Sequence, residues 1–590
     1  MQPPAKPMQL LSGIYDPQDL KKLTPELLVH LANEIREVLI RKVNETGGHL
    51  SPNLGFVEAT LALHYIFNSP QDKIVFDVSH QCYTHKIITG RKTNFLNPAK
   101  YNEISGFTNP AESEHDTFFI GHTSTAPSLA VGLAKARDLL GQKHNVIAVI
   151  GDGSLSGGEA LEGISNAAEL DTNFILVVND NEMSIAPNAG GLYKNLTELR
   201  HTTGQAKNNF FKAWGFDYIY VEDGNDIPSL IKAFSQVKDC LCPTVVHIHT
   251  LKGKGCKEAE QDKEKFHFIL PHTLDAKPQP QEPTYTSVTV DYLLQKHAQD
   301  WKLTVLSAGT PGAYGLTPDV RAKLGKNYVD VGIAEEHAIA MISGLAKGGA
   351  KPVFPVLSSF LQRTYDQLVQ DLALNNNPAT ILVFWGAITG GDATHQGLFD
   401  IPLISNIPNI VYLAPTNQEE YLAMLNWSVE QKAHPVAIRV PFAPLTHADG
   451  PVDSDYSTLN TFQVTHKGTR VAIVGAGSFY ELAKKAQAEI QHTLGIDATL
   501  INPRYVSGLD EKLLSDLLAD HELVITLEDG ILEGGFGQKV AAFYGPTKMK
   551  VLTFGAAKEF TDRVPLNELY ERYHLTPALI AQDVQKALAQ

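Results

Sequence analysis

Cysteine is scarce in this sequence, and its spacing provides no disulfide framework. The 590 residues include only Cys82, Cys240, Cys242 and Cys256. Secreted domains that depend on disulfides carry many paired cysteines, so this composition favours a reducing compartment. The Cys240-Leu-Cys242 pair also lacks the spacing of a zinc knuckle, and we interpret it as a packing feature.

Long apolar runs and excess positive charge are missing as well. No run of about 20 apolar residues occurs, and residues 1–16 contain no apolar core of signal-peptide length, so we expect a cytoplasmic protein with no membrane partner. The formal net charge is -16. Surfaces that bind nucleic acid are usually basic, so no nucleic-acid partner is expected. An anionic substrate would have to be held by local cationic side chains.

The remaining composition is that of a globular enzyme, with 43% hydrophobic and 19% charged residues. A chain of this length is expected to form about two to four domains. Proline-rich or polar segments at 273–286 and 445–457 divide it. The predicted domains are residues 1–275, 286–447 and 455–590.

Short apolar runs alternate with longer helical patterns in all three segments. The runs include 145–150, 174–178, 244–249, 380–384, 471–474 and 523–527. This alternation predicts an α/β fold with three doubly wound, mostly parallel sheets covered by helices on both faces. In such sheets, ligands bind beyond the carboxyl ends of the strands.

Polar residues follow two of these runs directly. Asp152 lies between two glycines after 145–150, and the segment NDNEMSI after 174–178 contains Asn181 and Met183. Glycines and a following helix favour a bound phosphate, but an aspartate would repel it unless a cation lies between them. A carboxylate, an amide oxygen and a main-chain carbonyl form a site suited to magnesium. Gly-Asp-Gly by itself would equally fit a tight turn with a capping aspartate.

The two motifs together resemble the thiamine diphosphate signature of transketolase-like enzymes. The surrounding sequence is more similar still to the 1-deoxy-D-xylulose-5-phosphate synthase family, in blocks at 46–68, 76–91, 119–136, 333–349 and 360–368. The resemblance implies a transketolase-like fold and a homodimer with thiamine diphosphate and magnesium as cofactors. It also implies small-molecule substrates, with pyruvate as donor and D-glyceraldehyde 3-phosphate as acceptor.

The resemblance further assigns cofactor-binding residues. Glu335 would bind the aminopyrimidine ring, whose imino form acts as the cofactor's own base, and Phe360 would pack on that ring. Glu335 alone would equally fit an acidic residue at a helix start, favoured by the helix dipole. The other implied cofactor residues are His80, Gly121, His122, Gly153, Ser154, Asn181, Met183, Ile185 and Lys252, and the implied metal ligands are Asp152, Asn181 and Met183.

Histidines are expected to transfer the remaining protons. His49, His80 and His122 follow small residues in turn contexts, where each one alone would equally fit a structural role. The resemblance implies that His49 and His122 orient and protonate a carbonyl oxygen, for which imidazole is suited near neutral pH. It also matches His267 and His395 to family positions. The predicted catalytic residues are Glu335, His49, His122 and His395.

The acceptor side departs from the family pattern. Arg363 and Arg439 match phosphate-binding arginines, whose planar fork fits phosphate, and Asp392 stands in for a family aspartate one position out of register. Other positions differ from the family, which has a tyrosine and an arginine in this region; the differing residues are Leu357, Phe384 and Trp385. We therefore expect weaker discrimination in favour of a phosphorylated aldehyde, and the acceptor itself stays open.

Other interpretations stay open at this stage. Residues 471–483 contain a Gly-x-Gly turn, but a dinucleotide site would need a third glycine and an acidic partner. A transketolase-like enzyme with another donor or acceptor would share most of the site. A catalytically silent scaffold would have no need of Glu335, so its retention favours an enzyme.

Overall fold

The computed structural model describes residues 9–275 and 282–589. The start of the chain and part of the predicted linker at 273–286 lie outside these residues. The described residues form two compact units. The first unit comprises the residues up to 275 together with Gly332–Ala334, and the second unit comprises the rest. None of the described helices has both the length and the apolar character needed to cross a membrane.

A five-stranded sheet forms the centre of the first unit. Its strands pair in parallel in the order β2 (Lys73–Phe76), β3 (Val146–Gly151), β4 (Phe174–Asp180), β6 (Pro243–His249) and β5 (Asp217–Val221). Alternate residues of β3 and β4 face opposite ways. One face packs on α7 (Ala126–Leu139) and α8 (Gly158–Ala167), and the other on α4 (Val57–Ile66) and α11 (Ile227–Val237). The central strands are therefore almost wholly apolar, as a sheet covered on both faces requires.

The first unit also contains a short antiparallel pair, β1 (Gly48–His49) with β7 (Phe268–Ile269). Its other helices are α1 (Pro17–Leu20), α2 (Pro25–Thr46), α3 (Ser51–Gly55), α5 (Tyr83–Lys86), α6 (Thr93–Leu96), α9 (Leu192–His201), α10 (Phe210–Ala213) and α12 (Lys257–Gln261). Thr24 caps α2 through its side chain, and Pro25 opens the helix, where its missing N–H is not needed.

The second unit contains a six-stranded parallel sheet. Its strand order is β12 (Val411–Leu413), β13 (Val436–Arg439), β11 (Thr380–Phe384), β10 (Lys351–Leu357), β8 (Leu303–Ser307) and β9 (Tyr328–Asp330). Helix α15 (Glu335–Lys347) covers one face, while α13 (Tyr285–Gln299) and α19 (Gln418–Glu430) cover the other. The shorter helices are α14 (Pro318–Leu324), α16 (Ser358–Leu361), α17 (Tyr365–Gln367) and α18 (Asp400–Ser405).

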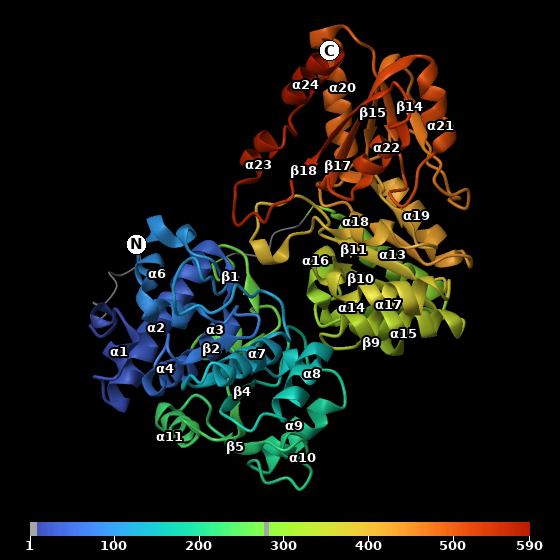
Figure 1. Ribbon diagram of the computed structural model, residues 1–590. Helices are drawn as coiled ribbons and strands as arrows, with labels where there is room; N and C mark the ends of the chain where they lie inside the picture. Colours follow the sequence, from blue (N-terminus) through green and yellow to red (C-terminus); the bar gives the residue numbers. More distant parts are fainter. Residues whose placement is uncertain (1–8, 276–281, 590) are drawn as a thin grey trace. The chain divides into compact units, whose positions relative to one another are not determined.

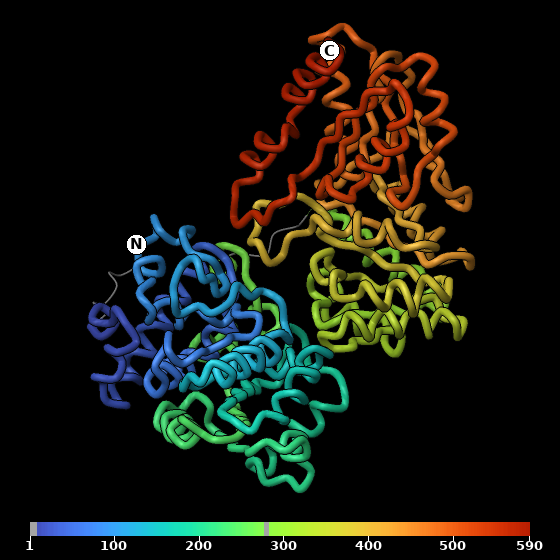
Figure 2. Tube along the Cα trace, in the orientation of Figure 1, coloured from blue at the N-terminus to red at the C-terminus, as the bar shows by residue number. Residues whose placement is uncertain are grey.

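A third sheet follows within the second unit. Its order is β14 (Gln463–His466), β16 (Thr499–Asn502), β15 (Arg470–Gly475), β17 (His521–Ile531) and β18 (Lys550–Ala556), with only β14 antiparallel. Helix α24 (Pro577–Ala589) runs beside α20 (Tyr480–Leu494) on one face, as Figure 1 shows in orange and red. The remaining helices are α21 (Glu511–Asp516), α22 (Phe536–Tyr544) and α23 (Leu566–Arg572). Figure 2 traces the same chain path without the ribbons.

These three mostly parallel sheets with helices on both faces confirm the predicted fold class. The second and third sheets contribute to one continuous hydrophobic core, in which Ile381 and Val383 belong to the same cluster as Ala472 and Val474. The domain limits inferred from the polar segments stay a prediction, because the compact units of the structure number two.

Candidate active site

The carboxyl ends of β3 and β4 lie side by side in the first unit. Gly151 at the end of β3 pairs with Asn179 on β4, and the backbone N–H of Asp152 donates to the carbonyl of Asn179 at 3.1 Å. The residues that follow the two strands, Asp152 and Asn181, are therefore brought to one edge of the sheet. This is the edge where parallel sheets bind ligands.

Asp152 is a buried carboxylate with a strongly shifted affinity for protons. Burial, with the nearby charge of Asp180, raises the pKa of Asp152 to about 8. Its one short side-chain hydrogen bond comes from the amide of Asn188, at 2.6 Å. Burial alone would raise the pKa of Asp180 too, but the hydrogen bond from His247 and the charge of Arg200 lower it to about 2. Asp180 thus has a cationic partner in Arg200, whereas the side-chain hydrogen bond to Asp152 comes from a neutral amide. A cation bound beside Asp152 would stabilise its ionised form.

The atoms around Asp152 fit such a cation. The side-chain oxygens of Asn181, Ser184 and Asn188 are buried and have no hydrogen-bond partner among the described residues. Uncharged oxygens beside a carboxylate are the donors that magnesium prefers. No group of three histidine, cysteine or acidic side chains in the described chain is arranged to hold a metal, so a site here would depend on these amide, hydroxyl and carbonyl oxygens.

The backbone in this region is packed too closely for larger residues. A Cβ atom added to Gly153 would lie 2.9 Å from the Cα of Ser184. The ammonium of Lys252 donates to the carbonyl of Ser184, and burial lowers the pKa of Lys252 to about 8. The remaining predicted cofactor residues of this segment are Ser154, which is buried, Met183, which forms a backbone bridge with Pro187, and Ile185, which is half-buried.

Three of the predicted histidines form a cluster. The ring of His49 lies 5.0 Å from that of His80 and 5.5 Å from that of His267, while His80 and His267 are 5.3 Å apart. Pairing of β1 with β7 sets His49 opposite Phe268. Burial and the charge of Lys252 hold the pKa of His267 well below its usual value, so this ring is neutral near pH 7.

The fourth predicted histidine, His122, occupies another position in the first unit. It follows the buried Gly121 in the turn that leads into α7, and it is half-buried. Ser124, two residues later, binds the backbone: its hydroxyl donates to the carbonyl of Ser154 at 2.9 Å. A side-chain hydrogen bond of Ser124 therefore ties the turn that carries His122 to the segment that directly follows Gly151-Asp152-Gly153.

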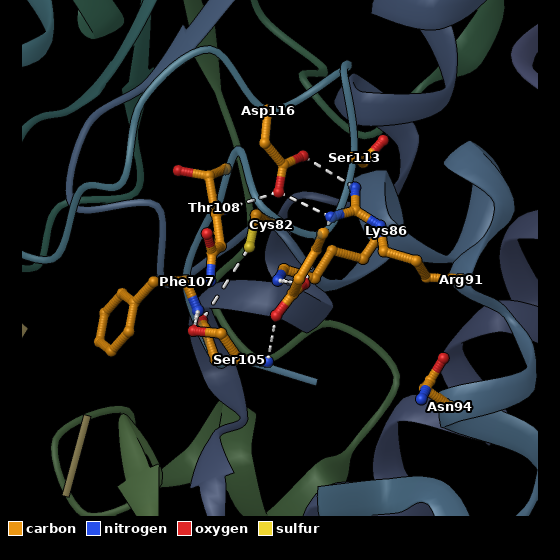
Figure 3. Close-up of polar contacts among 12 residues, drawn as sticks. Cys82, Lys86, Arg91, Asn94, Ser105, Phe107, Thr108, Ser113 and Asp116 are labelled. Atoms are coloured by element: carbon orange, nitrogen blue, oxygen red, sulfur yellow. Dashed lines mark hydrogen bonds and ion pairs between the residues drawn. The ribbon is translucent and has the colours of Figure 1, made fainter. Parts of the chain in front are cut away.

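A network of buried ion pairs lies around the segment that contains Phe107, a residue whose ring contacts the histidine cluster. The ammonium of Lys86 lies 2.5 Å from Glu112, and the guanidinium of Arg91 lies 2.6 Å from Asp116. Figure 3 shows these contacts around the segment that contains Phe107. The ring of Phe107 lies 5.8 Å from that of His49. The sequence analysis did not identify this network, because its acids and bases lie 25 or 26 residues apart and no local spacing links them.

Glu335 is the first residue of α15 in the second unit, and its carboxylate is buried. Burial raises the pKa of Glu335 to about 7, although the charge of Arg363 opposes the shift. The Oε2 atom lies 3.7 Å from Nη1 of Arg363, and it has no hydrogen-bond partner among the described residues. A buried carboxylate oxygen of this kind fits a ligand that presents an N–H donor, such as the ring of an aminopyrimidine.

Phe360 and His395 are in contact in the second unit. Their ring centroids are 5.7 Å apart in an edge-on arrangement. The Nδ1 atom of His395 lies 3.1 Å from the Asp392 carboxylate. Burial would raise the pKa of Asp392, but the hydrogen bonds from His395 and Thr394 lower it to about 2. Asp392 is therefore ionised and orients the His395 ring, an arrangement suited to holding a proton.

The guanidinium of Arg439, at the end of β13, is already bound to other groups of the protein. Its Nε atom lies 2.6 Å from Asp400, and its Nη2 atom donates to the carbonyl of Asp529 at 2.7 Å. Burial opposes its charge, but the charge of Asp400 outweighs this effect and raises the pKa of Arg439 above its usual value. The phosphate-binding role expected for Arg439 stays a prediction, and this geometry counts against it.

Loss of this ion pair is expected to destabilise the fold. Arg439→Ala leaves the buried Asp400 without its cation, so we expect the free energy of unfolding to fall by about 3–5 kcal/mol. Arg470→Ala is the control, because Arg470 and its partner Glu522 are both half exposed, and such pairs contribute less than about 1 kcal/mol. Urea-induced unfolding measures both. Equal, small losses would mean that Arg439 has no structural role and is available for a ligand.

The other residues that depart from the family pattern lie near the same strand ends. Leu357 is buried and its N–H donates to the hydroxyl of Tyr314 at 3.1 Å. The ring of Phe384 is also buried, 5.3 Å from that of Tyr314, whereas Trp385 is exposed. Of Phe384, which ends β11, and Trp385, which directly follows it, only Trp385 is therefore available to a ligand.

Comparisons with known proteins identify related families. Residues 11–209 and 198–250 match the family 1-deoxy-D-xylulose-5-phosphate synthase, residues 285–445 the transketolase pyrimidine binding domain, and residues 460–580 the transketolase C-terminal domain. A solved transketolase from Leishmania mexicana is 16% identical, with a TM-score of 0.43, over 96% of this chain and 97% of that chain.

Curated relatives cover nearly the whole chain. The 1-deoxy-D-xylulose-5-phosphate synthase of Symbiobacterium thermophilum is 39% identical over 98% of this chain and 95% of its own length. That of Desulforudis audaxviator is 37% identical over 96% of each chain. The resemblance noted in the sequence is confirmed, and this chain belongs to the 1-deoxy-D-xylulose-5-phosphate synthase family.

Proposed function

We propose that this chain is a thiamine diphosphate-dependent carboligase that transfers a two-carbon unit from pyruvate to an aldehyde. In the balanced reaction, pyruvate, an aldehyde and one proton give an α-hydroxyketone and carbon dioxide. The carboxyl C–C bond of pyruvate breaks, and a new C–C bond forms to the aldehyde carbon. With D-glyceraldehyde 3-phosphate as acceptor, the product is 1-deoxy-D-xylulose 5-phosphate, a precursor for isoprenoids, thiamine and pyridoxal.

One observation carries the proposal: Glu335 is a buried carboxylate whose Oε2 atom has no hydrogen-bond partner among the described residues. An ionised group in this position costs folding free energy. A protein with no catalytic use for this carboxylate would be expected to have replaced it. When bound, thiamine diphosphate supplies a nucleophilic carbon that accepts the two-carbon unit. Glu335 would accept a hydrogen bond from the pyrimidine ring, and Phe360 would pack against that ring.

The first unit would hold the diphosphate. We propose that Asp152, Asn181 and the main-chain carbonyl of Met183 bind a magnesium ion, and that Lys252 adds a positive charge. The unpartnered oxygen of Asn181 and the raised pKa of Asp152, caused by burial, support this assignment. His80, Gly121, Gly153, Ser154 and Ile185 complete the proposed cofactor set.

Proton transfer to the acceptor would be the task of histidines. We propose that His49 and His122 orient and protonate the aldehyde oxygen, which gains a proton as the new bond forms. The ring contacts of His49 with His80 and His267 support this proposal, because they place three imidazoles, groups suited to proton transfer, close together. His395, oriented by Asp392, would serve the same purpose in the second unit.

The oligomeric state and the cellular location of the protein are also part of the proposal. The family resemblance supports a homodimer, and the low cysteine content supports a reducing, cytoplasmic location. Arg363, Arg439 and Asp392 remain the proposed contacts to a substrate phosphate, although Arg363 already lies 3.7 Å from Glu335 and Arg439 is bound to Asp400 and to the carbonyl of Asp529.

Release of carbon dioxide from pyruvate tests the proposal. With thiamine diphosphate and magnesium present, we expect carbon dioxide and a hydroxyketone to form when D-glyceraldehyde 3-phosphate is added. Consumption of a ketose phosphate without carbon dioxide would favour a transketolase-type donor instead. No reaction with any donor, despite tight cofactor binding, would favour the catalytically silent homologue.

A further inference from the structure

Two large aromatic side chains lie exposed and in contact where neighbouring strands of the six-stranded sheet end. Trp385 directly follows β11, and Phe442 lies three residues after β13, the parallel neighbour of β11. Their ring centroids are 6.1 Å apart, and the two residues are 45% and 47% exposed. Exposed rings at the ligand-binding edge of a parallel sheet are suited to contact a flat or apolar group.

The backbone holds Trp385 in this outward position. Its φ is 56°, a left-handed conformation that a bulky residue rarely adopts. Close packing maintains it: a Cβ atom on Gly397 would lie 1.8 Å from the carbonyl oxygen of Trp385, and one on Gly386 would lie 2.8 Å from Nε of Arg439. Strained residues that the surrounding fold maintains are concentrated at binding and catalytic sites.

The same loop connects the aromatic pair to the proposed reaction site. Gly397, which packs on the backbone of Trp385, lies two residues after His395. The His395 ring in turn contacts Phe360, the proposed neighbour of the cofactor ring, at 5.7 Å. Trp385 and Phe442 are therefore positioned next to residues that would surround the reacting carbon.

The chain segments that carry the aromatic pair are acidic. Residues 384–410 contain two aspartates and residues 440–466 contain three, and neither segment contains a lysine or an arginine. Arg439, at the end of β13, uses its guanidinium to bind Asp400 and the carbonyl of Asp529. Asp400 is bound to Arg439 and Asp453 to Arg504, so these carboxylates already have cationic partners. A phosphate dianion beside the aromatic pair would therefore find no lysine or arginine supplied by the two segments, and Arg439 already engaged.

We propose that Trp385 and Phe442 form the acceptor subsite and select uncharged aldehydes with an aromatic or aliphatic face over phosphorylated aldehydes. This inference rests on the proposed function, because it names the acceptor of that reaction. Apolar contact with the two rings supplies the affinity, and the two segments offer no lysine or arginine to a phosphate group.

Competing acceptors test the subsite in the full-length enzyme. With pyruvate as donor, we expect kcat/KM for benzaldehyde to equal or exceed that for D-glyceraldehyde 3-phosphate. Trp385→Asn, chosen because asparagine tolerates left-handed backbone, should lower kcat/KM for benzaldehyde about tenfold or more, since base or ring stacking on tryptophan commonly contributes that much. Phe442→Arg should shift the ratio about tenfold towards the phosphorylated acceptor, since it adds a fork that fits phosphate.

A matched control is Trp301→Ala. Trp301 is 77% exposed and lies before β8, at the opposite end of the same sheet, so its loss should leave the acceptor ratio unchanged. Circular dichroism establishes that each variant is folded, and Phe442→Arg carries the test if Trp385→Asn is not. A wild-type preference of about tenfold for the phosphorylated aldehyde, or an unchanged ratio in the folded variants, overturns the inference.

The two proposals fail in different ways. Carbon dioxide release accompanied by a strong preference for phosphate removes the aromatic subsite and leaves the carboligase intact. Absence of carbon dioxide with every aldehyde, including benzaldehyde, removes the carboligase and with it the acceptor subsite.

Discussion

Glu335→Gln is expected to bind thiamine diphosphate with near wild-type affinity and to lose turnover by about three orders of magnitude or more, the scale of removing an essential acid or base. The amide is the same size as the carboxylate, so packing around α15 is kept. Unlike a carboxylate, it carries no negative charge to stabilise the pyrimidine ring in its reactive tautomer. Hydrogen–deuterium exchange at the thiazolium carbon, followed by NMR after acid quench, measures this step directly.

The control for this variant is the neighbouring residue. Glu336→Gln makes the same chemical change one position along the helix, where the side chain is only half-buried. We expect its exchange rate to remain close to that of the wild type. Exchange in Glu335→Gln as fast as in the wild type would rule out the role of this carboxylate.

The same variant is expected to stabilise the cofactor-free protein at alkaline pH. The pKa of Glu335 is raised by burial to about 7, above its ordinary value near 4.5. Below pH 4.5 the group is protonated in both the folded and the unfolded state and costs nothing. Between pH 4.5 and 7 the group is ionised in the unfolded state but still protonated in the folded state, so stability falls as the pH rises, by a total of about 3 kcal/mol that is fully lost above pH 7.

Unfolding of the apoprotein in urea at pH 4.5 and pH 8 measures this linkage. Glu335→Gln should match the wild type at the lower pH and exceed it at the higher pH, since glutamine does not ionise. A pH-independent difference between the two proteins would show that the carboxylate is not the group that titrates. If Glu335→Gln is less active but more stable than the wild type, the carboxylate is retained for its catalytic role at a cost in stability.

The position of the Asp152 motif could be predicted from the sequence because the signals are local. An apolar run followed by a glycine-flanked aspartate predicts a strand and a ligand-binding turn. The expectation that Asn181 lies close by required only that two consecutive strands be neighbours, which is the commonest arrangement. The pairing of Gly151 with Asn179 confirms that neighbourhood.

Other features of the site depend on contacts that are distant in the sequence. Arg439 was assigned to phosphate because it matches a phosphate-binding arginine of the family, yet its partner Asp400 lies 39 residues earlier on another element. The burial of Glu335 could not be predicted either, because an acid at a helix start is usually exposed. The contact between Trp385 and Phe442 likewise arises only when β11 and β13 pair.

Asp152→Asn is expected to weaken the binding of thiamine diphosphate with magnesium by about 100-fold or more, since loss of a charged metal ligand exceeds the 10–100-fold cost of losing its supporting partners. The asparagine has the same shape as the aspartate, and it retains an oxygen that can accept the hydrogen bond from Asn188. It lacks the charge that would hold the cation between the protein and the diphosphate. Isothermal titration of the apoprotein measures the affinity.

Asp171→Asn provides the matched control for this prediction. Asp171 is exposed and precedes β4 at the opposite end of the same sheet, so it has no part in the proposed metal site. Its variant should bind the cofactor like the wild type, and both variants should retain the wild-type circular dichroism spectrum. Since magnesium joins the diphosphate to the carboxylate, the loss in Asp152→Asn should shrink when magnesium is omitted from the titration. A loss of the same size with and without the metal would mean that Asp152 contributes through packing alone.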